Sequence, residues 1–257
     1  MSMIRQKITD GLPYLQSDRL LRLGVSHGWF GVALGDTMPK DDIVKQRWAR
    51  ACSVLGVDSL KLVQTTGISQ SSTSLWINDE AAGGIVGPAD GFVTKTQGMP
   101  LWLRAADCMQ MVIYDPVPKV MAVVHAGGKG VAGDVLSNTL ELMADHQAEP
   151  SRMIVGIGPA IGPEHFIPTR EVDGFTLDDI EGIAPVSVEL SDGRKGYDIV
   201  ATACSRLAEL GVLSSNIETS GIDTYADTGF YSYERDRIHA PAEATYRNGF
   251  FVQIDIT

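Results

Sequence analysis

Apolar residues recur every three or four positions in three segments, which is the spacing typical of amphipathic helices. Residues 41–55 begin with aspartates that can cap a helix, and Gly56 marks the end of the segment. The apolar face of this segment consists of Val44, Trp48, Cys52 and Leu55. The same pattern predicts helices over residues 134–146 and over residues 198–210, the latter capped by Asp198.

Short apolar runs between these helices predict strands. The runs are 60–64, 101–104, 109–114, 119–125, 152–157 and 250–256. Two of them flank DPVPK, a turn with two prolines, and therefore form an antiparallel hairpin. Strands interspersed with helices indicate a layered α/β protein with a mixed sheet. Neither loop-rich stretch, 65–90 or 226–245, resembles a linker between separate cores, so we expect one domain over residues 1–257.

Composition narrows the class of protein. The net charge is −11 and no run of Lys or Arg occurs, which argues against a nucleic-acid partner. The apolar runs fall far below the ~18–20 residues of a membrane span, and the N-terminus lacks the apolar core of a signal peptide. The chain has 3 cysteines, an odd and sparse set that favours a reducing compartment. We therefore expect a cytoplasmic protein without membrane association.

The predicted hairpin brings a thiol and an imidazole together. In an antiparallel hairpin, residues equally far from the turn lie opposite each other. With a turn centred near Val117, Cys108 pairs with His125. Their Cβ atoms would then lie roughly 4.5–5.5 Å apart. A one-residue error in the register would weaken this inference, because it moves a side chain to the other face of the sheet.

A thiol beside an imidazole supports two chemistries, a thiolate–imidazolium nucleophile or two ligands of a zinc site. A third interpretation has no chemistry: Cys108 as a small buried apolar residue and His125 as a satisfied core histidine. Asp107, directly before the cysteine, either orients His125 or a substrate amine or bonds to the nearby turn. Gly127 and Gly128, directly after the hairpin, let the backbone approach a ligand closely.

Several short motifs can be compared with known families. ADC at 106–108, followed by HAGGKG at 125–130, is the most specific pair and resembles ADC…HAGWRG. Supporting segments are SHGWF at 26–30, IGPAIGPEHF at 157–166, YDI at 197–199 and FYSYERD at 230–236. Together they resemble a divergent member of the bacterial laccase-domain family, the purine nucleoside phosphorylase and polyphenol oxidoreductase group. The resemblance runs from about residue 24 to the end.

The resemblance implies a three-layer α/β/α fold and a zinc ion held by one cysteine and two histidines. It implies phosphorolysis and deamination of adenosine and related purine nucleosides, with nucleoside and phosphate as partners. Cys108 and His125 would then hold zinc or act on the substrate directly, and Asp107 would handle a proton. The positive charge for phosphate would come from Lys129, Arg235 and Arg247.

The sequence departs from the family where substrate and metal should bind. Thr66 occupies the place of the family's first metal histidine, and a neutral hydroxyl is a poor zinc ligand beside imidazole and thiolate. Gly128 and Lys129 replace a tryptophan and an arginine, so the bidentate fork for phosphate is lost. Asp223 replaces a cysteine. His165 or His27 could in principle supply the missing ligand.

Three functions remain open. The first is a nucleoside phosphorylase or deaminase with an altered metal site. The second is a metal-free Cys–His hydrolase or deamidase, which explains why the pair is kept while a ligand is lost. The third is a non-catalytic protein that binds a nucleoside on the same scaffold.

The first prediction concerns zinc. A catalytic zinc site needs three protein ligands and an open fourth position, and Cys108 and His125 supply two. Loss of the third should weaken binding roughly a thousandfold or more, given zinc-site energies of about 10–16 kcal/mol. We expect protein purified without chelator to carry less than one zinc per chain, and Thr66→His to restore it, both measured by elemental analysis. One zinc per wild-type chain would show that the interpretation of Thr66 is wrong.

Overall fold

The computed structural model describes residues 4–38, 42–65, 72–180 and 185–256. Within them lie six α-helices, with bounds α1 Asp18–Arg22, α2 Asp42–Leu55, α3 Gly128–Ala132, α4 Val135–Ala144, α5 Ile199–Glu209 and α6 Tyr233–His239. Short 3₁₀ turns occur at η1 Ser59–Lys61, η2 Asp79–Ala81, η3 Pro150–Arg152, η4 Leu177–Asp179 and η5 Ser214–Asn216. None of the helices of this described part is long and apolar enough to cross a membrane.

The strands form two large sheets. The first has five antiparallel strands in the order β1 Ile4–Thr9, β2 Leu12–Ser17, β3 Val25–Phe30, β15 Asn248–Ile254 and β8 Leu101–Ala105. The second has six strands in the order β14 Ile217–Thr219, β11 Ile154–Ile157, β9 Met109–Asp115, β10 Val120–Ala126, β7 Gly91–Thr94 and β5 Ser74–Trp76. This sheet is mixed, because both of its edge strands run parallel to their neighbours.

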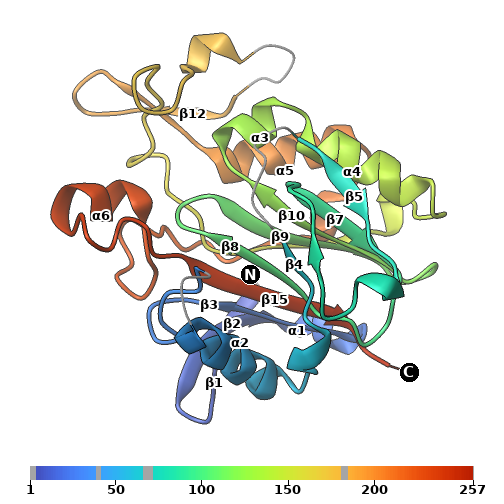
Figure 1. Cartoon of the computed structure of the whole chain (residues 1–257). Coiled ribbons are helices and arrows are strands. Elements are labelled where there is room, and N and C mark those ends of the chain that lie inside the picture. The colour runs from blue at the N-terminus through green and yellow to red at the C-terminus, as the bar shows by residue number, and fades with distance from the viewer. Residues whose placement is uncertain (1–3, 39–41, 66–71, 181–184, 257) are drawn as a thin grey trace.

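Two short strand pairs lie outside the large sheets: β12 Ser187–Glu189 with β13 Lys195–Tyr197, and β4 Gln64–Thr65 with β6 Ile85–Val86. The segment that carries β12 and β13 protrudes from the body of the molecule beside α5, as the yellow and orange part of Figure 1 shows. It brings residues 163–175 back over the end of the six-stranded sheet, where the cavity described below lies.

Three hydrophobic cores follow from the alternation of side chains along the strands. One lies between the sheets, where Leu103 and Val252 of one sheet pack with Val123 of the other. A second lies under α3, α4 and α5, on the outer face of the six-stranded sheet. The third lies between the five-stranded sheet and α2, around Trp48 and Trp102. Figure 1 shows the resulting order of helices, sheet, sheet and helix.

The predicted α/β class is therefore confirmed, with helices on both outer sides and a mixed sheet; the β layer consists of two packed sheets. The helices predicted over 41–55, 134–146 and 198–210 correspond to α2, α4 and α5. The strand predicted over 60–64 is wrong, because Asp58 caps the turn η1 over Ser59–Lys61 and the strand β4 covers only Gln64–Thr65. The single-domain organisation stays a prediction.

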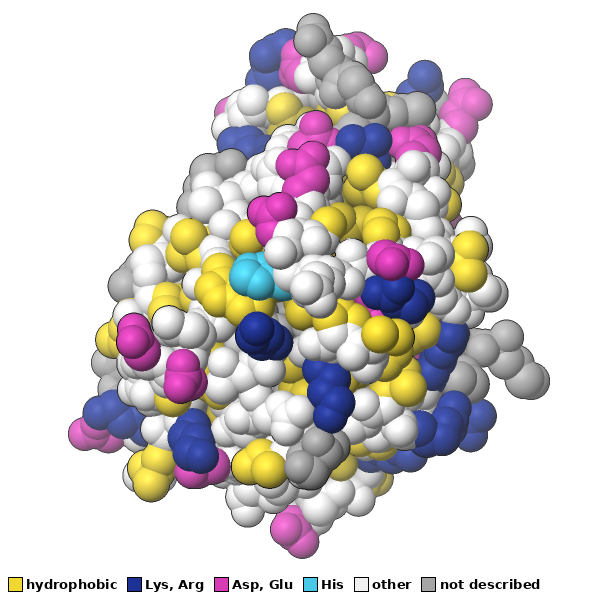
Figure 2. Space-filling model, turned by 90° about the vertical axis from the view of Figure 1, so that its right-hand side faces the viewer, with side chains coloured by type: hydrophobic (Ala, Val, Ile, Leu, Met, Phe, Trp, Pro, Cys, Tyr) yellow, Lys and Arg dark blue, Asp and Glu magenta, His cyan; other side chains and the backbone are white. Residues whose placement is uncertain are grey.

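On the face of the molecule shown in Figure 2, basic and acidic side chains are interspersed, and the basic ones are not gathered into one patch. Such a mixture is ordinary for a solvated protein surface, whereas a nucleic-acid binder carries clustered cations on its contact face. The exclusion of a nucleic-acid partner stays a prediction from the charge of the chain.

His27 of β3 generates a prediction about pH. Its ring is fully buried, accepts at Nε2 from the Ser17 amide at 2.8 Å and donates at Nδ1 to the Val25 carbonyl at 2.9 Å. Burial lowers the pKa of His27 from 6.5 to about 4. Because the unfolded chain takes up the proton first, stability present above pH 6.5 is lost as the pH falls toward 4, by up to about 1.4 kcal/mol per pH unit.

Urea unfolding across that pH range should therefore show a shallower dependence for His27→Gln than for the wild type. The exposed His239→Gln is a matched control and should keep the wild-type slope. Equal slopes for the wild type and His27→Gln would contradict the prediction.

Candidate active site

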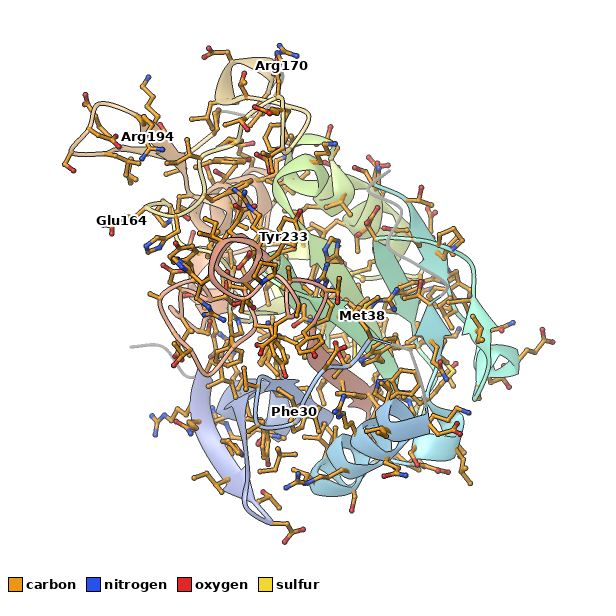
Figure 3. All side chains as sticks on the ribbon, turned by 60° about the vertical axis from the view of Figure 1, so that its left-hand side comes forward. Phe30, Met38, Glu164, Arg170, Arg194 and Tyr233 are labelled. Atoms are coloured by element: carbon orange, nitrogen blue, oxygen red, sulfur yellow. The ribbon has the colours of Figure 1, made fainter. Side chains whose placement is uncertain are left out.

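A cavity of about 480 Å³ opens at the ends of the two sheets. Its walls come from the end of β8 and the loop to β9, from the end of β10 and α3, from residues 161–175, and from α6. Figure 3 labels two lining residues from different parts of the chain, Tyr233 on α6 and Met38 in the segment before α2. Cys108 and His125 both line this cavity, as the sequence led us to expect.

The hairpin register differs by two residues from the predicted one. His125 lies opposite Gln110, and the register places Cys108 opposite Gly127. The reason is the turn: Asp115 accepts from the Val117 amide at 3.0 Å, so the turn spans four residues and its centre lies past Val117. A slip of two keeps both side chains on the same face, because side chains alternate with a period of two. The predicted pair is therefore brought together, diagonally rather than directly opposite.

The thiol and the imidazole continue the rows of side chains that face the space between the sheets. Val112 on β9 and Val123 on β10 belong to that core, and Cys108 and His125 follow on the same faces at the strand ends. A Cβ on Gly127 would lie 2.6 Å from the Cys108 Sγ, so only glycine leaves room for the sulfur there. The Cys108 side chain is within hydrogen-bonding reach of His125.

Asp90 is a third member of this group that sequence reasoning missed. It lies directly opposite His125 across the β7–β10 ladder, and its carbonyl accepts from the His125 amide at 2.7 Å. Its carboxylate is 1% exposed, lies 3.5 Å from His125 Nδ1 and accepts from the Ser72 amide at 3.1 Å. The signal was the acidic residue directly before the strand at 91–94, a strand that the apolar pattern did not reveal.

The electrostatics of His125 follow from its two neighbours. Burial lowers the pKa of this imidazole, but the negative charge and hydrogen bond of Cys108, with further contributions from Asp90, outweigh burial and raise the pKa to about 9. The cation is favoured because it lies beside the Cys108 side chain and the Asp90 carboxylate. The arrangement Asp90–His125–Cys108 can thus hold or deliver a proton at the wall of the cavity.

Asp107 anchors α6 and also lines the cavity. Its carboxylate accepts from Thr224 Oγ1 at 2.6 Å and from the Glu234 amide at 2.8 Å, and it is 7% exposed. Its backbone is left-handed, with φ of 81°, a conformation that costs a non-glycine residue on the order of 1 kcal/mol. Each oxygen of the carboxylate accepts from one of these donors, and the role predicted for Asp107 in handling a proton stays a prediction.

The two glycines after the hairpin make room for side chains of the site. A Cβ on Gly128 would lie 2.6 Å from Phe175 Cζ and 3.1 Å from Phe166. These two phenylalanines form an aromatic wall of the cavity. Lys129 is exposed and lines the cavity on the same side, with its Nζ beside the backbone of Gly174. The part that Gly127, Gly128 and Lys129 play in binding a ligand stays a prediction.

The arginines divide into two groups. Arg235 does not line the cavity, which corrects its predicted contact with phosphate: its guanidinium donates to the carbonyls of Thr224, Tyr225, Asp227 and Phe230 and to the Asp236 carboxylate. Arg247 lines the cavity, held by the carbonyls of Ala244 and Tyr246, and its contact with phosphate stays a prediction. Arg104 also lines it and was missed, because it stands in the apolar run LWLR.

The metal site is incomplete among the described residues, where no group of three His, Cys, Asp or Glu side chains can hold an ion. Both alternative histidines are engaged elsewhere. His27 is buried between Ser17 and Val25, and His165 is paired with Asp223 at 2.6 Å and stacked on Tyr225. Thr66 lies outside the described residues. The expectation that Cys108 and His125 supply two zinc ligands, where a catalytic site needs three, stays a prediction.

The site and the fold together define a protein with a Cys–His pair at the end of packed sheets. A family model described as multi-copper polyphenol oxidoreductase laccase matches residues 20–243, so the chain belongs to this family. It is 31% identical over 218 residues to a purine nucleoside phosphorylase of Deinococcus radiodurans, covering 83% of this chain and 80% of that protein. A purine nucleoside phosphorylase of Corynebacterium glutamicum is 28% identical over 205 residues, covering 79% of this chain and 81% of that protein.

Solved structures show the same fold. YlmD from Geobacillus stearothermophilus matches with a TM-score of 0.84 at 22% identity, over 100% of both chains. The hypothetical protein YfiH of Bacillus licheniformis matches with a TM-score of 0.83 at 20% identity, over 97% of this chain and 99% of that chain. At these identities the likeness establishes the fold.

The site also generates a prediction about the reactivity of the three thiols. Burial raises the pKa of Cys52 to about 12 and that of Cys204 to about 11, whereas Cys108 lies at the cavity wall beside the imidazolium of His125. In metal-free protein near neutral pH, iodoacetamide should label Cys108 at least about ten times faster than the other two. Peptide mass spectrometry measures the three rates. His125→Asn should slow Cys108 alone, and equal, slow labelling of all three would rule out an activated thiol.

Proposed function

We propose that this protein is an enzyme of the purine nucleoside phosphorylase and deaminase type, acting on adenosine or a related purine nucleoside. The observation that carries the proposal is the layout of the cavity. The Cys108–His125 pair, two arginines (Arg104 and Arg247) and an aromatic wall line the same cavity. A nucleoside needs an apolar surface for its base, and phosphate needs cations. Both kinds of surface are present in the cavity that holds the pair.

The aromatic wall suits the purine. Phe166 and Phe175 pack edge to face, with ring centroids 6.4 Å apart, and they border the cavity next to Gly128. A base against this wall would place the ribose near Cys108 and His125, with the cationic end of the cavity beyond it. The relatives named purine nucleoside phosphorylase support this choice of substrate class.

In phosphorolysis, an oxygen of hydrogen phosphate forms a bond to C1′ of the ribose while the bond from C1′ to the purine nitrogen breaks. The electron pair of that bond stays on the purine, which takes up a proton, and the phosphate loses one. His125 is suited to this exchange, since Cys108 and Asp90 raise its pKa to about 9 and keep a proton on the ring near neutral pH. The proposal derives no step from a metal.

A second candidate is a Cys–His hydrolase or deamidase. Asp90 favours it, because a buried carboxylate 3.5 Å from the imidazole completes the order of carboxylate, imidazole and thiol that activates a cysteine nucleophile. The same carboxylate would also orient a metal-bound histidine, so Asp90 is compatible with both candidates. A non-catalytic nucleoside-binding protein is the remaining alternative, and cytoplasmic localisation stays a prediction.

The test is a direct assay. Clean, zinc-replete protein incubated with adenosine and phosphate should release adenine, or inosine and hypoxanthine where it also deaminates, followed by chromatography. Cys108→Ala should lower kcat/KM by about a hundredfold or more, and Asp90→Asn by at least about tenfold, because acid–base groups contribute about 10²–10⁴. Cys204→Ala, on α5 away from the cavity, is the matched control and should keep full activity.

No turnover of any purine nucleoside would contradict the enzyme proposal. Thermal stabilisation by adenosine without turnover would then favour the binding protein. Release of ammonia from a glutamine substrate, dependent on Cys108, would favour the deamidase.

A further inference from the structure

Arg104 is an unusual buried cation. It lies on β8 opposite Gly249 of β15 and is 8% exposed. Its Nη1 is buried and has no hydrogen-bond partner among the residues that the structure describes. An arginine stays charged in proteins, so a guanidinium buried in this way lacks a counter-charge. Such an arrangement is costly unless a ligand completes it.

A second cation lies beside it. Arg247 precedes β15, so the strand register puts it diagonally across from Arg104, and both line the cavity. Burial and then the charge of Arg247 lower the pKa of the Arg104 guanidinium. Two neighbouring cations repel each other, and an anion between them would convert that repulsion into attraction.

The carboxylates that line the same cavity are committed to other groups. Asp90 serves Ser72 and His125, and Asp107 holds Thr224 and the amide of Glu234. Two more, Asp173 and Glu234, accept from the Thr169 amide and from Arg237 respectively. None of these hydrogen bonds and ion pairs reaches Arg104, so these four carboxylates do not neutralise it.

The guanidinium is also positioned for a ligand. Its Cζ lies 5.1 Å from the centroid of the Trp102 ring, which supports the cation on one side by a cation–π contact. Arg247 is held by two backbone carbonyls, those of Ala244 and Tyr246, at 2.9 and 2.8 Å. A planar guanidinium binds an oxyanion through two parallel hydrogen bonds, which a lysine cannot do.

We infer that Arg104 and Arg247 form an oxyanion subsite of the cavity, which binds phosphate as the second substrate. This inference rests on the proposed function, because the phosphorolysis proposed above requires a place for phosphate. Two sources share this chemistry: free inorganic phosphate, and a phosphate group carried by the organic substrate. Arg104 takes the place that motif likeness gave to Arg235, whose guanidinium is bound to backbone carbonyls.

The test measures binding without turnover. Thermal unfolding in a chloride buffer is followed against a series of inorganic phosphate, and in a second arm against adenosine 5′-monophosphate. Phosphate should raise the Tm of the wild type, and Arg104→Lys should weaken its apparent affinity about ten- to a hundredfold, since charged hydrogen bonds are lost. The exposed Arg194→Gln, on the protruding segment, is the control and should bind like the wild type.

A stability readout separates a binding role from a structural one. Arg104→Met removes the buried charge at similar volume, so its Tm without phosphate should equal or exceed that of the wild type, while phosphate no longer stabilises it. A structural arginine would behave in the opposite way, with a lower Tm and an unchanged response to phosphate. That result would overturn the inference. If Arg104→Met does not fold, Arg104→Lys decides by its phosphate response alone.

The two arms distinguish the sources. An Arg104-dependent response to adenosine 5′-monophosphate but not to phosphate would place the oxyanion on the organic substrate, which keeps the subsite and removes phosphate as its occupant. A response to neither overturns the subsite. Phosphate binding that depends on Arg104 without any turnover would leave the subsite standing while phosphorolysis fails. If Arg104→Lys catalyses phosphorolysis with an unchanged KM for phosphate, the subsite is overturned while the proposed phosphorolysis stands.

Discussion

The pairing of β10 with strands on both of its sides is the constraint on which the site depends. The strand is buried along its whole length and bonded to β9 on one side and β7 on the other. Because its position is fixed from both sides, His125 at its end meets a thiol carried by one neighbour and a carboxylate carried by the other. The raised pKa of the imidazole follows from this placement, since Cys108 and Asp90 stabilise the cation even where burial disfavours charge.

The sequence predicted the Cys108–His125 pair from the hairpin and from the alternation of side chains along its strands. The hairpin placed Cys108 and His125 near each other, and the two-residue error in the turn did not change the face on which they lie. Asp90 escaped prediction because its strand, Gly91–Thr94, is short, starts with glycine and shows no alternation that a pattern could detect. The three N-terminal strands escaped for a related reason: the alternation along them is irregular, as the burial of β2 and β3 shows.

The direction of the arginine side chains was the other feature that the sequence did not predict. Arg235 and Arg104 both lie in segments near the cavity, yet the first turns to backbone carbonyls and the second borders the cavity. Nothing in a linear motif distinguishes these outcomes, because they depend on which carbonyls a loop leaves without partners. An arginine in an otherwise apolar strand run was the only available signal for Arg104. Burying this unpaired charge destabilises the folded protein, and the proposed binding of an oxyanion would explain why Arg104 is kept.

Asp107 links the position of the Cys108 thiol to the position of α6. Its left-handed backbone directs the next residue, Cys108, to the cavity, while its carboxylate holds the first turn of α6. The α6 wall of the cavity and the Cys108 thiol therefore share one attachment point. A substitution that shifts α6 would therefore shift the Cys108 sulfur as well. Residues 172–175 border the cavity from the protruding segment, so substitutions there can change which substrates fit without shifting the sulfur. In evolutionary terms, one wall of this cavity is constrained and the other is open to change.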